Sequence, residues 1–356
     1  MTVDEAIAKY LGYIQASQSP GTSRTYATGL RHFAHFLATR SVLPRTTDVQ
    51  SLTIAVATDY ITWLYEYLLE RAGGQPEKIS ESTKATYFAA LSGFFEYLIV
   101  EAQLLPMSTS DYDALRKAMA KAAKRRQRSE LPPEKLPTQE IVQTLLAEAS
   151  KPLELGEDTP EGTRRRLDLA RLRDIAIIHA LLSSGMRVGE LVRLERGHML
   201  YQVKGAVVKY TKSKKEREVL FSESAWDAIQ TYLKARADGA QKRPLASLPV
   251  FARHDSRAGT NVLPLTTRSV QNTFMDLASR AGILERFHLT PHTLRHYFAT
   301  EFLSETGDLA LTQYALGHSS PTTTRIYAQT KREDYRRAHR SIFGKDVGRG
   351  KKTTSD

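Results

Sequence analysis

Apolar side chains in the first third of the chain recur with the three- and four-residue spacing of amphipathic helices. The segment Thr22–Tyr26 is followed by such a pattern at Leu30, Phe33, Phe36 and Leu37. The same pattern returns 61 residues later, where Thr83–Tyr87 is followed by Leu91, Phe94, Tyr97 and Leu98. Helical spacing also covers Tyr10–Ile14 and Ile61–Leu69. We therefore expect four or five packed helices, with the aromatic side chains forming their common core.

The chain after Leu136 combines helical patterns with two stretches typical of short β-strands. The strands are expected at Tyr201–Tyr210 and Arg217–Phe221, joined by a lysine-rich turn. A polar segment, Lys151–Arg166, is expected to be a surface loop. The expected helices are Thr138–Ala149, Leu167–Ser183, Ser224–Ala237, Arg268–Ala281, Pro291–Thr306, Leu309–Leu316, one beginning at Pro321, and Glu333–Phe343. This second part should be mainly α-helical with a small antiparallel sheet.

A basic segment that contains prolines separates the two parts. Arg116–Arg128 carries seven basic residues and no acidic one, and Pro132, Pro133 and Pro137 disfavour a continuing helix. We expect a helical domain over residues 1–115, a linker over 116–137, a second domain over 138–343 and a disordered basic tail over 344–356. The linker is either a solvated connector or a strap that binds a phosphate backbone, and the charge of the whole chain favours the strap. Its contacts would be Lys124, Arg125, Arg126 and Arg128.

The charge of the chain narrows the class of partner. With 51 Lys and Arg against 39 Asp and Glu, the net charge is +12, which points to nucleic acid or to an anionic membrane surface. The longest apolar stretch, Ile175–Leu182, is too short to cross a bilayer, and the acidic N-terminus does not resemble a secretory signal. The chain has no cysteine, which excludes disulfides, thiol nucleophiles and cysteine-ligated metals. We expect a cytoplasmic protein associated with the nucleoid, with double-stranded DNA rather than membrane as its partner.

Four segments carry candidate chemistry: Ser184–Leu194 (SGMRVGELVRL), Tyr210–Glu218 (YTKSKKERE), Thr290–Thr300 (TPHTLRHYFAT) and Leu316–Gln329 (LGHSSPTTTRIYAQ). In the third, Thr290 and Pro291 suit the start of a helix, which places His292 and Arg295 one turn apart near its positive end. Such a helix end suits a phosphate group. Taken singly, each motif is also explained by packing, because structural arginines, core histidines and buried tyrosines are common.

Taken together and in this order, the four segments resemble the signature of the tyrosine recombinases, also called phage-type integrases. The signature is Arg, Lys, His-x-x-Arg, His and Tyr, and the resemblance covers almost the whole chain because the helical first part resembles the core-binding domain of these enzymes. It implies a two-domain, C-shaped clamp around duplex DNA. Because the chain begins almost at once with the first helix, we expect no additional arm-binding domain, as in Xer- and Cre-like members.

The resemblance implies a role for each matching residue. Arg187 and Arg295 would bind the nonbridging oxygens of the scissile phosphate, since a guanidinium fork suits that geometry. His292 and His318 would add hydrogen bonds to the phosphate, and Tyr327 would attack it to form a 3′-phosphotyrosyl link. Lys212 would protonate the leaving oxygen, with its neighbours Lys214 and Lys215 as DNA contacts, although the choice among the three lysines rests on alignment alone. Glu190 would orient the site.

The same chemistry implies neither a cofactor nor a metal ion. Arginine and imidazole groups can stabilise the charge of the transition state, and the covalent link conserves the energy of the phosphodiester. The resemblance implies a homo-tetramer acting on two inverted-repeat sites, with Glu333–Phe343 packing on an adjacent protomer through Ile342, Phe343 and Tyr335. An accessory protein, the target sequence and the biological role are left open.

Two other classes of function remain as alternatives. A type IB topoisomerase shares this chemistry but relaxes DNA as a monomer, and the core-binding domain argues against it. A DNA-binding protein without catalytic activity would have no need of Tyr327 beside His318. Relaxation of a plasmid would separate the first alternative from a recombinase, and trapping on a suicide substrate would test the second.

Overall fold

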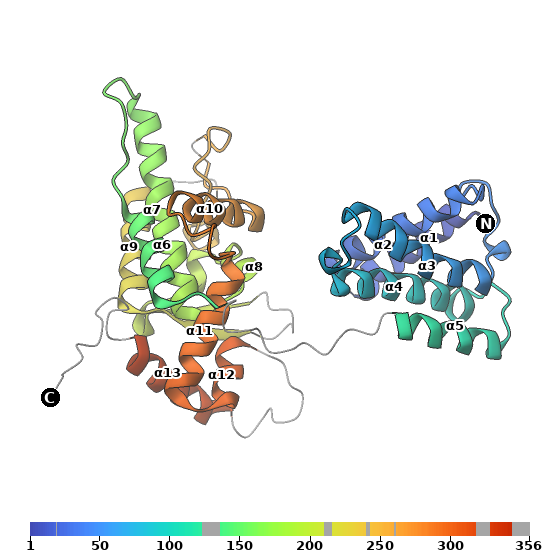
Figure 1. Ribbon diagram of the computed structural model, residues 1–356. Helices are drawn as coiled ribbons and strands as arrows, with labels where there is room; N and C mark the ends of the chain where they lie inside the picture. The colour runs from blue at the N-terminus through green and yellow to red at the C-terminus, as the bar shows by residue number, and fades with distance from the viewer. Residues whose placement is uncertain are drawn as a thin grey trace. The chain divides into compact units, whose positions relative to one another are not determined.

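The computed structural model describes residues 1–18, 20–122, 136–209, 216–239, 243–259, 261–317 and 328–343. The chain forms two compact units, Met1–Glu130 and Leu131–Asp356 (Figure 1). Both are built mainly of helices, and the second also holds a small antiparallel sheet. The fold class expected from the sequence is therefore confirmed. None of the helices in the described ranges is long and apolar enough to cross a membrane.

Over its described residues, the first unit is a bundle of five α-helices. They are α1 (Val3–Ser17), α2 (Pro20–Thr39), α3 (Ile54–Arg71), α4 (Glu81–Glu96) and α5 (Thr109–Ala122). Side chains of Thr2, Thr53 and Ser80 accept hydrogen bonds from backbone N–H groups in the first turns of α1, α3 and α4, which explains where these helices begin. The predicted aromatic core is present, since Phe33, Phe36, Phe88 and Phe94 are at most 1% exposed.

The repeated sequence pattern corresponds to α2 and α4, which pack closely against each other. A Cβ atom on Gly29 would lie 3.1 Å from the Cβ of Ala90 and 3.2 Å from the Cα of Tyr87, so a larger residue would make this contact tighter than usual. The hydroxyl of Tyr60 on α3 donates a hydrogen bond to the carbonyl of Gly29 at 3.3 Å. The two copies of the pattern therefore lie side by side in one core.

The boundary expected at residue 116 is wrong, because α5 continues to Ala122. Leu115 and Met119, four residues apart, are 2% and 1% exposed in the core of the first unit, so the segment is held by packing despite its basic surface. Arg116 also forms an ion pair with Asp113 at 3.4 Å. The seven residues from 116 to 122 thus belong to the helical unit rather than to a linker.

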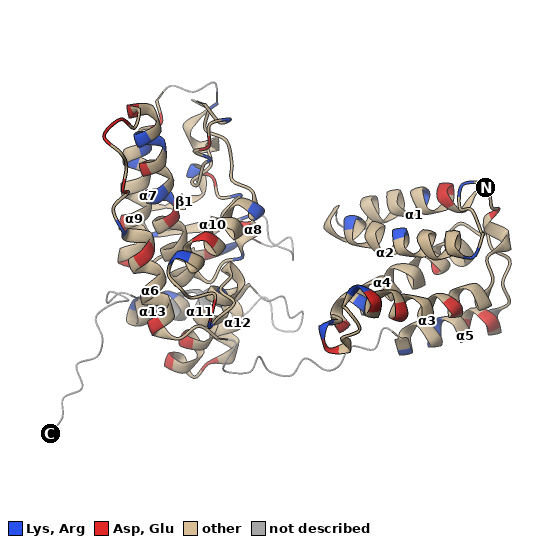
Figure 2. Cartoon of the chain, turned by 45° about the horizontal axis from the view of Figure 1, so that its top comes forward, with Lys and Arg blue, Asp and Glu red and all other residues tan. Residues whose placement is uncertain are grey.

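The second unit is organised around the long helix α7 (Glu161–Ser184), whose C-terminal half is buried. Figure 1 shows α6 and α9 alongside it. The other elements are α6 (Gln139–Ser150), α8 (Val188–Leu191), β1 (Met199–Leu200), β2 (Gly205–Val208), β3 (Arg217–Leu220), α9 (Glu223–Arg236), α10 (Thr267–Arg280), α11 (Pro291–Thr306), α12 (Leu309–Leu316) and α13 (Ala328–Phe343). Basic and acidic residues are interspersed along the helices of each unit (Figure 2).

Two expectations about this unit are corrected. Helix α7 begins at Glu161 and not at Leu167. The polar residues Thr163–Arg166 are part of the helix, and the apolar pattern used to predict its start does not include them. Within the expected strand Tyr201–Tyr210, the described strand is β2 (Gly205–Val208); Tyr201–Val203 form a 3₁₀ turn, Lys204 has φ +51°, and β1 (Met199–Leu200) precedes the expected range. The sheet is antiparallel in the order β1-β2-β3, and Val208 pairs with Arg217.

In the single chain, helix α13 packs on its own domain, whereas the sequence predicts that it packs on an adjacent protomer of a tetramer. Tyr335 is fully buried, and its hydroxyl accepts a hydrogen bond from the backbone N–H of Leu220 at 3.1 Å. The ring of Phe343 stacks on Phe298 of α11, with centroids 5.4 Å apart. A separate cluster of α11, α12, α13 and β3 side chains thus takes up the residues expected to be intermolecular anchors, including partly buried Ile342.

Candidate active site

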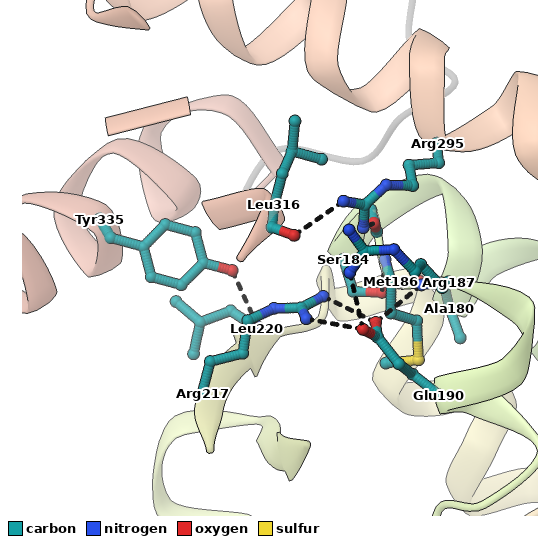
Figure 3. Close-up of polar contacts among 11 residues, drawn as sticks. Ala180, Ser184, Met186, Arg187, Glu190, Arg217, Leu220, Arg295, Leu316 and Tyr335 are labelled. Carbon is teal, nitrogen blue, oxygen red and sulfur yellow. Dashed lines mark hydrogen bonds and ion pairs between the residues drawn. The ribbon is translucent and has the colours of Figure 1, made fainter. Parts of the chain in front are cut away.

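Two arginines bind one carboxylate, and a third arginine lies beside them, where α7, α8, β3, α11 and α12 meet (Figure 3). The arginines are Arg187, Arg217 and Arg295, and the carboxylate belongs to Glu190. Three segments far apart in the sequence supply them: the turn from α7 into α8, the first residue of β3 and the second turn of α11. The arrangement is therefore a product of the tertiary fold.

The turn that presents Arg187 depends on a glycine at the end of α7. Gly185 caps the helix with φ +58°, and a Cβ atom at this position would overlap the ring of Phe298. Arg187 is the N-cap of α8, and the Glu190 carboxylate accepts hydrogen bonds from its backbone N–H at 2.8 Å and from its Nη1 at 3.0 Å. The Arg187 side chain is 36% exposed, so its guanidinium is restrained on one edge and open to solvent on another.

Arg217 binds the same carboxylate from the opposite side, and sequence reasoning did not single it out. Its Nη1 lies 3.1 Å from Oε1 of Glu190 and its Nη2 lies 2.9 Å from Oε2, a two-point ion pair in which the side chains are 8% and 3% exposed. Burial alone would raise the pKa of Glu190, but the hydrogen bonds and charge of Arg217, and then those of Arg187, hold this pKa below its usual range.

Arg295 is held between the C-terminal ends of two helices. Its Nη1 donates to the carbonyl of Gly185, the cap of α7, and its Nη2 donates to the carbonyl of Leu316, the last residue of α12, at 2.7 Å. Both helix ends are the negative poles of their dipoles, which favours a cation. The residue is 5% exposed, and burial together with the charges of Arg187 and Arg217 lowers its pKa to about 9. Arg295 therefore stays charged at neutral pH in a site with excess positive charge.

The charge balance of this cluster favours an anionic ligand. The three guanidinium groups and one carboxylate leave two positive charges uncompensated, and the pKa of Arg295 is lowered first by burial and then by repulsion from Arg187 and Arg217. An anion such as a phosphodiester would relieve this repulsion, and the planar forks of arginine match its oxygens. The arrangement can therefore bind and polarise a phosphate group.

His292 lies in the first turn of α11 and is exposed. Its ring lies 4.4 Å from that of His296, measured between centroids, at an angle of 54°. Arg295, three residues later, is turned into the protein, so the two side chains of the His-x-x-Arg motif differ in burial although they share a helix face.

Several residues singled out from the sequence lie outside the described ranges. These are Lys212, Lys214 and Lys215 in the segment between β2 and β3, His318, Tyr327, and the residues Lys124, Arg125, Arg126 and Arg128 of the predicted linker. The structure describes the elements on either side of residues 210–215 and 318–327. Val208 and Arg217 form the last pair of the β2–β3 ladder before the lysine turn. Gly317 ends α12 just before His318, and Ala328 begins α13 just after Tyr327.

Comparison with known proteins identifies the family. Residues 159–334, which include Arg187, Glu190, Arg217 and Arg295, match the model of the phage integrase family. The chain is 27% identical to tyrosine recombinase XerC from Halalkalibacterium halodurans over 341 residues, which cover 95% of this chain and 97% of that protein. It is also 27% identical to tyrosine recombinase XerD from Listeria innocua over 314 residues, which cover 88% and 89% of the two chains.

Solved structures of such enzymes have the same fold. The XerH recombinase bound to its difH substrate in a pre-cleavage complex aligns with a TM-score of 0.58 and 18% identity, over 94% of this chain and 80% of that one. The Tn1549 transposon integrase in complex with transposon right end DNA aligns with a TM-score of 0.59 and 17% identity, over 95% and 100%. The chain belongs to the phage integrase family and is a tyrosine-type site-specific recombinase or integrase.

Proposed function

We propose that this enzyme cuts and rejoins DNA at specific sites through a covalent bond between Tyr327 and a 3′-phosphate, and exchanges strands between two sites in a tetramer. The observation that carries the proposal is the site of Arg187, Arg217 and Arg295 around Glu190, which keeps an excess of positive charge where a phosphate would bind. The match of residues 159–334 to the family model supports it, because this range also contains Lys212, His318 and Tyr327.

In the proposed reaction, Arg187 and Arg295 bind the nonbridging oxygens of the scissile phosphate. The Tyr327 oxygen attacks phosphorus, a new O–P bond forms, and the bond from phosphorus to the 5′-oxygen breaks. Lys212 donates a proton to that oxygen, while His292 and His318 hydrogen bond to the phosphate and help to move protons. The cationic side chains supply the transition-state stabilisation. Rejoining reverses these steps, so the phosphotyrosyl bond conserves the energy that ligation needs.

The proposed partner is duplex DNA with inverted-repeat sites, bound within the nucleoid. The solved structures of XerH and of the Tn1549 integrase, which have the same fold, are both complexes with DNA. Lys124, Arg125, Arg126 and Arg128 would neutralise backbone phosphates, with Lys214 and Lys215 as further contacts. In the proposed tetramer, Glu333–Phe343 packs on an adjacent protomer through Tyr335, Ile342 and Phe343, which contact their own domain in the single chain.

A groove on the first unit supports a second contact with DNA. The start of α2 lines one side with Arg24, Thr25 and Thr28, and the start of α4 lines the other with residues that include Thr86 and Tyr87. Thr25 and Thr86 occupy equivalent positions in the repeated sequence pattern, so the repeat gives the groove two similar sides. Arginine and hydroxyl side chains are frequent contacts to the DNA backbone.

The direct test is covalent trapping of DNA by the whole protein. Nicked duplexes that carry a randomised sequence are incubated with the enzyme, the protein is denatured, and the DNA that stays attached is sequenced. We expect one enriched sequence with inverted-repeat character, joined to Tyr327 through its 3′-phosphate. Plasmids with one or two copies of that sequence then separate the classes of enzyme. Relaxation of the single-site plasmid without recombination of the two-site plasmid would indicate a type IB topoisomerase, and the absence of any attached DNA would indicate a binding protein.

A further inference from the structure

Of the three arginines in the cluster, Arg217 is the one to which the proposed reaction gives no role, and its side chain is buried. Its side chain is 8% exposed, whereas that of Arg187 is 36% exposed. Both of its terminal nitrogens are bonded to Glu190, and its buried Nε has no hydrogen-bond partner among the described residues. A guanidinium so enclosed is poorly placed to bind DNA itself.

The Arg217 side chain packs against the C-terminal end of α12. Gly317 has φ +64°, and a Cβ atom there would lie 2.7 Å from Cδ and 2.9 Å from Nη1 of Arg217. The Arg217 side chain therefore lies directly against the glycine backbone. The preceding carbonyl, that of Leu316, accepts a hydrogen bond from Arg295. Two consecutive residues at the end of α12 thus fix two arginines of the cluster.

Arg217 is linked to Arg187 through the Glu190 carboxylate. Arg217 holds both carboxylate oxygens of Glu190, and the same oxygens accept the backbone N–H and Nη1 of Arg187. Among the residues that the structure describes, Glu190 is the group that restrains the Arg187 guanidinium. If Arg217 were removed, the ion pairs of Glu190 in the described part of the chain would be reduced to that with Arg187, whose side chain is 36% exposed.

We propose that Arg217 is a positioning residue of the phosphate site: it fixes the Glu190 carboxylate, and through it the guanidinium of Arg187, without touching the substrate. The proposal rests on the proposed function of this site in phosphodiester transfer. Arg217 is also the first residue of β3, paired with Val208, so the same contact fixes the strand into which the lysine turn leads.

A positioning role through Glu190 has a distinct pH signature. In the described part of the chain, the charged groups that act on the Glu190 carboxylate are Arg187 at the start of α8, Arg217 on β3 and Arg295 on α11. Burial raises the pKa of this carboxyl, and Arg217 is the largest of the influences that lower it. Removal of Arg217 should therefore raise the pKa of Glu190, and protonated Glu190 can no longer hold Arg187 by charge.

The test compares Arg217→Met and Arg217→Lys with Arg236→Met. Arg236 forms an equally buried two-point ion pair with another carboxylate, that of Asp238, at 2.7 and 2.6 Å, so its loss controls for the structural cost of removing such a pair. For each variant we would measure the affinity for the DNA duplex that the wild-type protein traps, and the single-turnover rate of covalent attachment at saturating protein between pH 5 and pH 9.

We expect Arg217→Met to attach to DNA about 100-fold more slowly, which is the cost of a misplaced catalytic group. Its affinity for the duplex should change by less than about threefold, because Arg217 does not contact DNA. When the solution is acidified, the attachment rate of Arg217→Met should begin to fall at a higher pH than the wild-type rate does. Arg217→Lys should recover part of the rate and the wild-type acidic limb. The double variant Arg217→Met/Glu190→Gln has no carboxylate at position 190 to titrate. The loss of rate on acidification that Arg217→Met introduces should therefore be absent from it.

The proposal is overturned if Arg217→Met attaches at the wild-type rate, if Arg236→Met loses as much rate per folded molecule, or if the acidic limb does not move. A measurement without DNA separates these outcomes from a failure of the proposed function. The ¹³C resonance of the Glu190 carboxyl, assigned by its absence in Glu190→Gln, should titrate at a higher pH in Arg217→Met than in the wild type. If the wild type attaches no DNA but this change in titration is present, the assigned reaction is wrong and the ion pair stands. If the titration is the same in both proteins, the positioning role is wrong.

Discussion

Arg336 of α13 forms a two-point ion pair with Glu218, the residue next to Arg217 on β3. Its Nε and Nη2 lie 2.6 and 2.8 Å from the two carboxylate oxygens of Glu218, whose side chain is 3% exposed. Successive side chains of a strand point to opposite faces, so Arg217 meets Glu190 while Glu218 meets α13. One short strand thus joins the arginine cluster to the helix that begins directly after Tyr327.

We expect Arg336→Met to lower the free energy of unfolding by about 2 kcal/mol, because the buried Glu218 carboxylate loses both of these contacts. The figure is below that for a fully enclosed pair because the Arg336 side chain is 31% exposed. Urea unfolding at pH 7 measures it. Arg340→Met, which removes an exposed cation one turn later, should change stability by less than about 0.5 kcal/mol. Equal effects of the two substitutions would contradict a specific contribution from the pair.

Folding stability should fall as the pH is lowered from 6.5 to 4. Burial lowers the pKa of His339, whose Nε2 lies 2.7 Å from the carbonyl of Ser183, to about 4. Burial and then the charges of Arg173 and Arg236 lower the pKa of His254 to about 4. The unfolded chain takes up protons on both histidines in this window and the folded chain does not, so stability is complete above pH 6.5 and is lost toward pH 4.

Each of these histidines should contribute about 3 kcal/mol to the loss, because a tenfold change in a protonation equilibrium corresponds to roughly 1.4 kcal/mol. His339→Gln should therefore show a smaller difference in unfolding free energy between pH 7 and pH 4.5 than the wild type. The exposed His288 provides the control, since His288→Gln should leave that difference unchanged. An identical pH dependence in His339→Gln would show that His339 takes up its proton in the folded state.

Tyr327→Phe should bind its DNA site with wild-type affinity and form no covalent adduct, because it lacks the attacking oxygen. Denaturing gel electrophoresis of protein with labelled nicked duplex measures the adduct. Tyr335→Phe is a matched control eight residues later, where burial raises the pKa of a hydroxyl that is bonded to the backbone of Leu220. It should still form adduct, at a stability cost of about 1 kcal/mol. Adduct formed by Tyr327→Phe would refute the assigned nucleophile.

Lys212→Ala should attach to ordinary DNA very slowly but recover on DNA whose 5′-bridging oxygen is replaced by sulfur. An alkoxide needs a proton as it leaves, and a positioned general acid is worth about 10²–10⁴-fold, whereas a thiol with a pKa near 8.5 leaves without one. Arg187→Ala and Arg295→Ala should gain far less from sulfur, since both act on nonbridging oxygens. Rescue of Lys214→Ala or Lys215→Ala in place of Lys212→Ala would move the general acid along the turn, and rescue of none would direct attention to His292 or His318.

Replacement of Lys124, Arg125, Arg126 and Arg128 by glutamine should weaken DNA binding and flatten its dependence on salt. If all four neutralise phosphates, the slope of log affinity against log salt concentration should become shallower by about 3 to 4. Replacement of Arg164, Arg165 and Arg166 at the start of α7 controls for a general loss of charge. A slope that does not respond to the first set of changes would show that this segment makes no contact with phosphate.

Local patterns in the sequence were sufficient to predict most of the helices and the class of fold. The periodic aromatic residues of α2 and α4 report burial on one helix face, and this depends only on spacing along the chain. The glycine caps after Leu316 and Ser184 are likewise local, because few other residues adopt a positive φ at little cost. The order of the motifs was enough to recognise the family to which the chain belongs.

Tertiary packing decided what those patterns could not. The basic residues at 116–122 conceal the contribution of Leu115 and Met119, whose burial extends α5. The apolar pattern at Tyr335 and Phe343 predicts burial but does not specify the domain that buries them, and in the single chain they are buried in their own. Arg217 is one cation in a run of charged residues, and only the pairing of β3 and the end of α12 turn it toward Glu190. An ion pair between positions 27 residues apart depends on where the fold brings the two side chains, and spacing along the chain does not encode that.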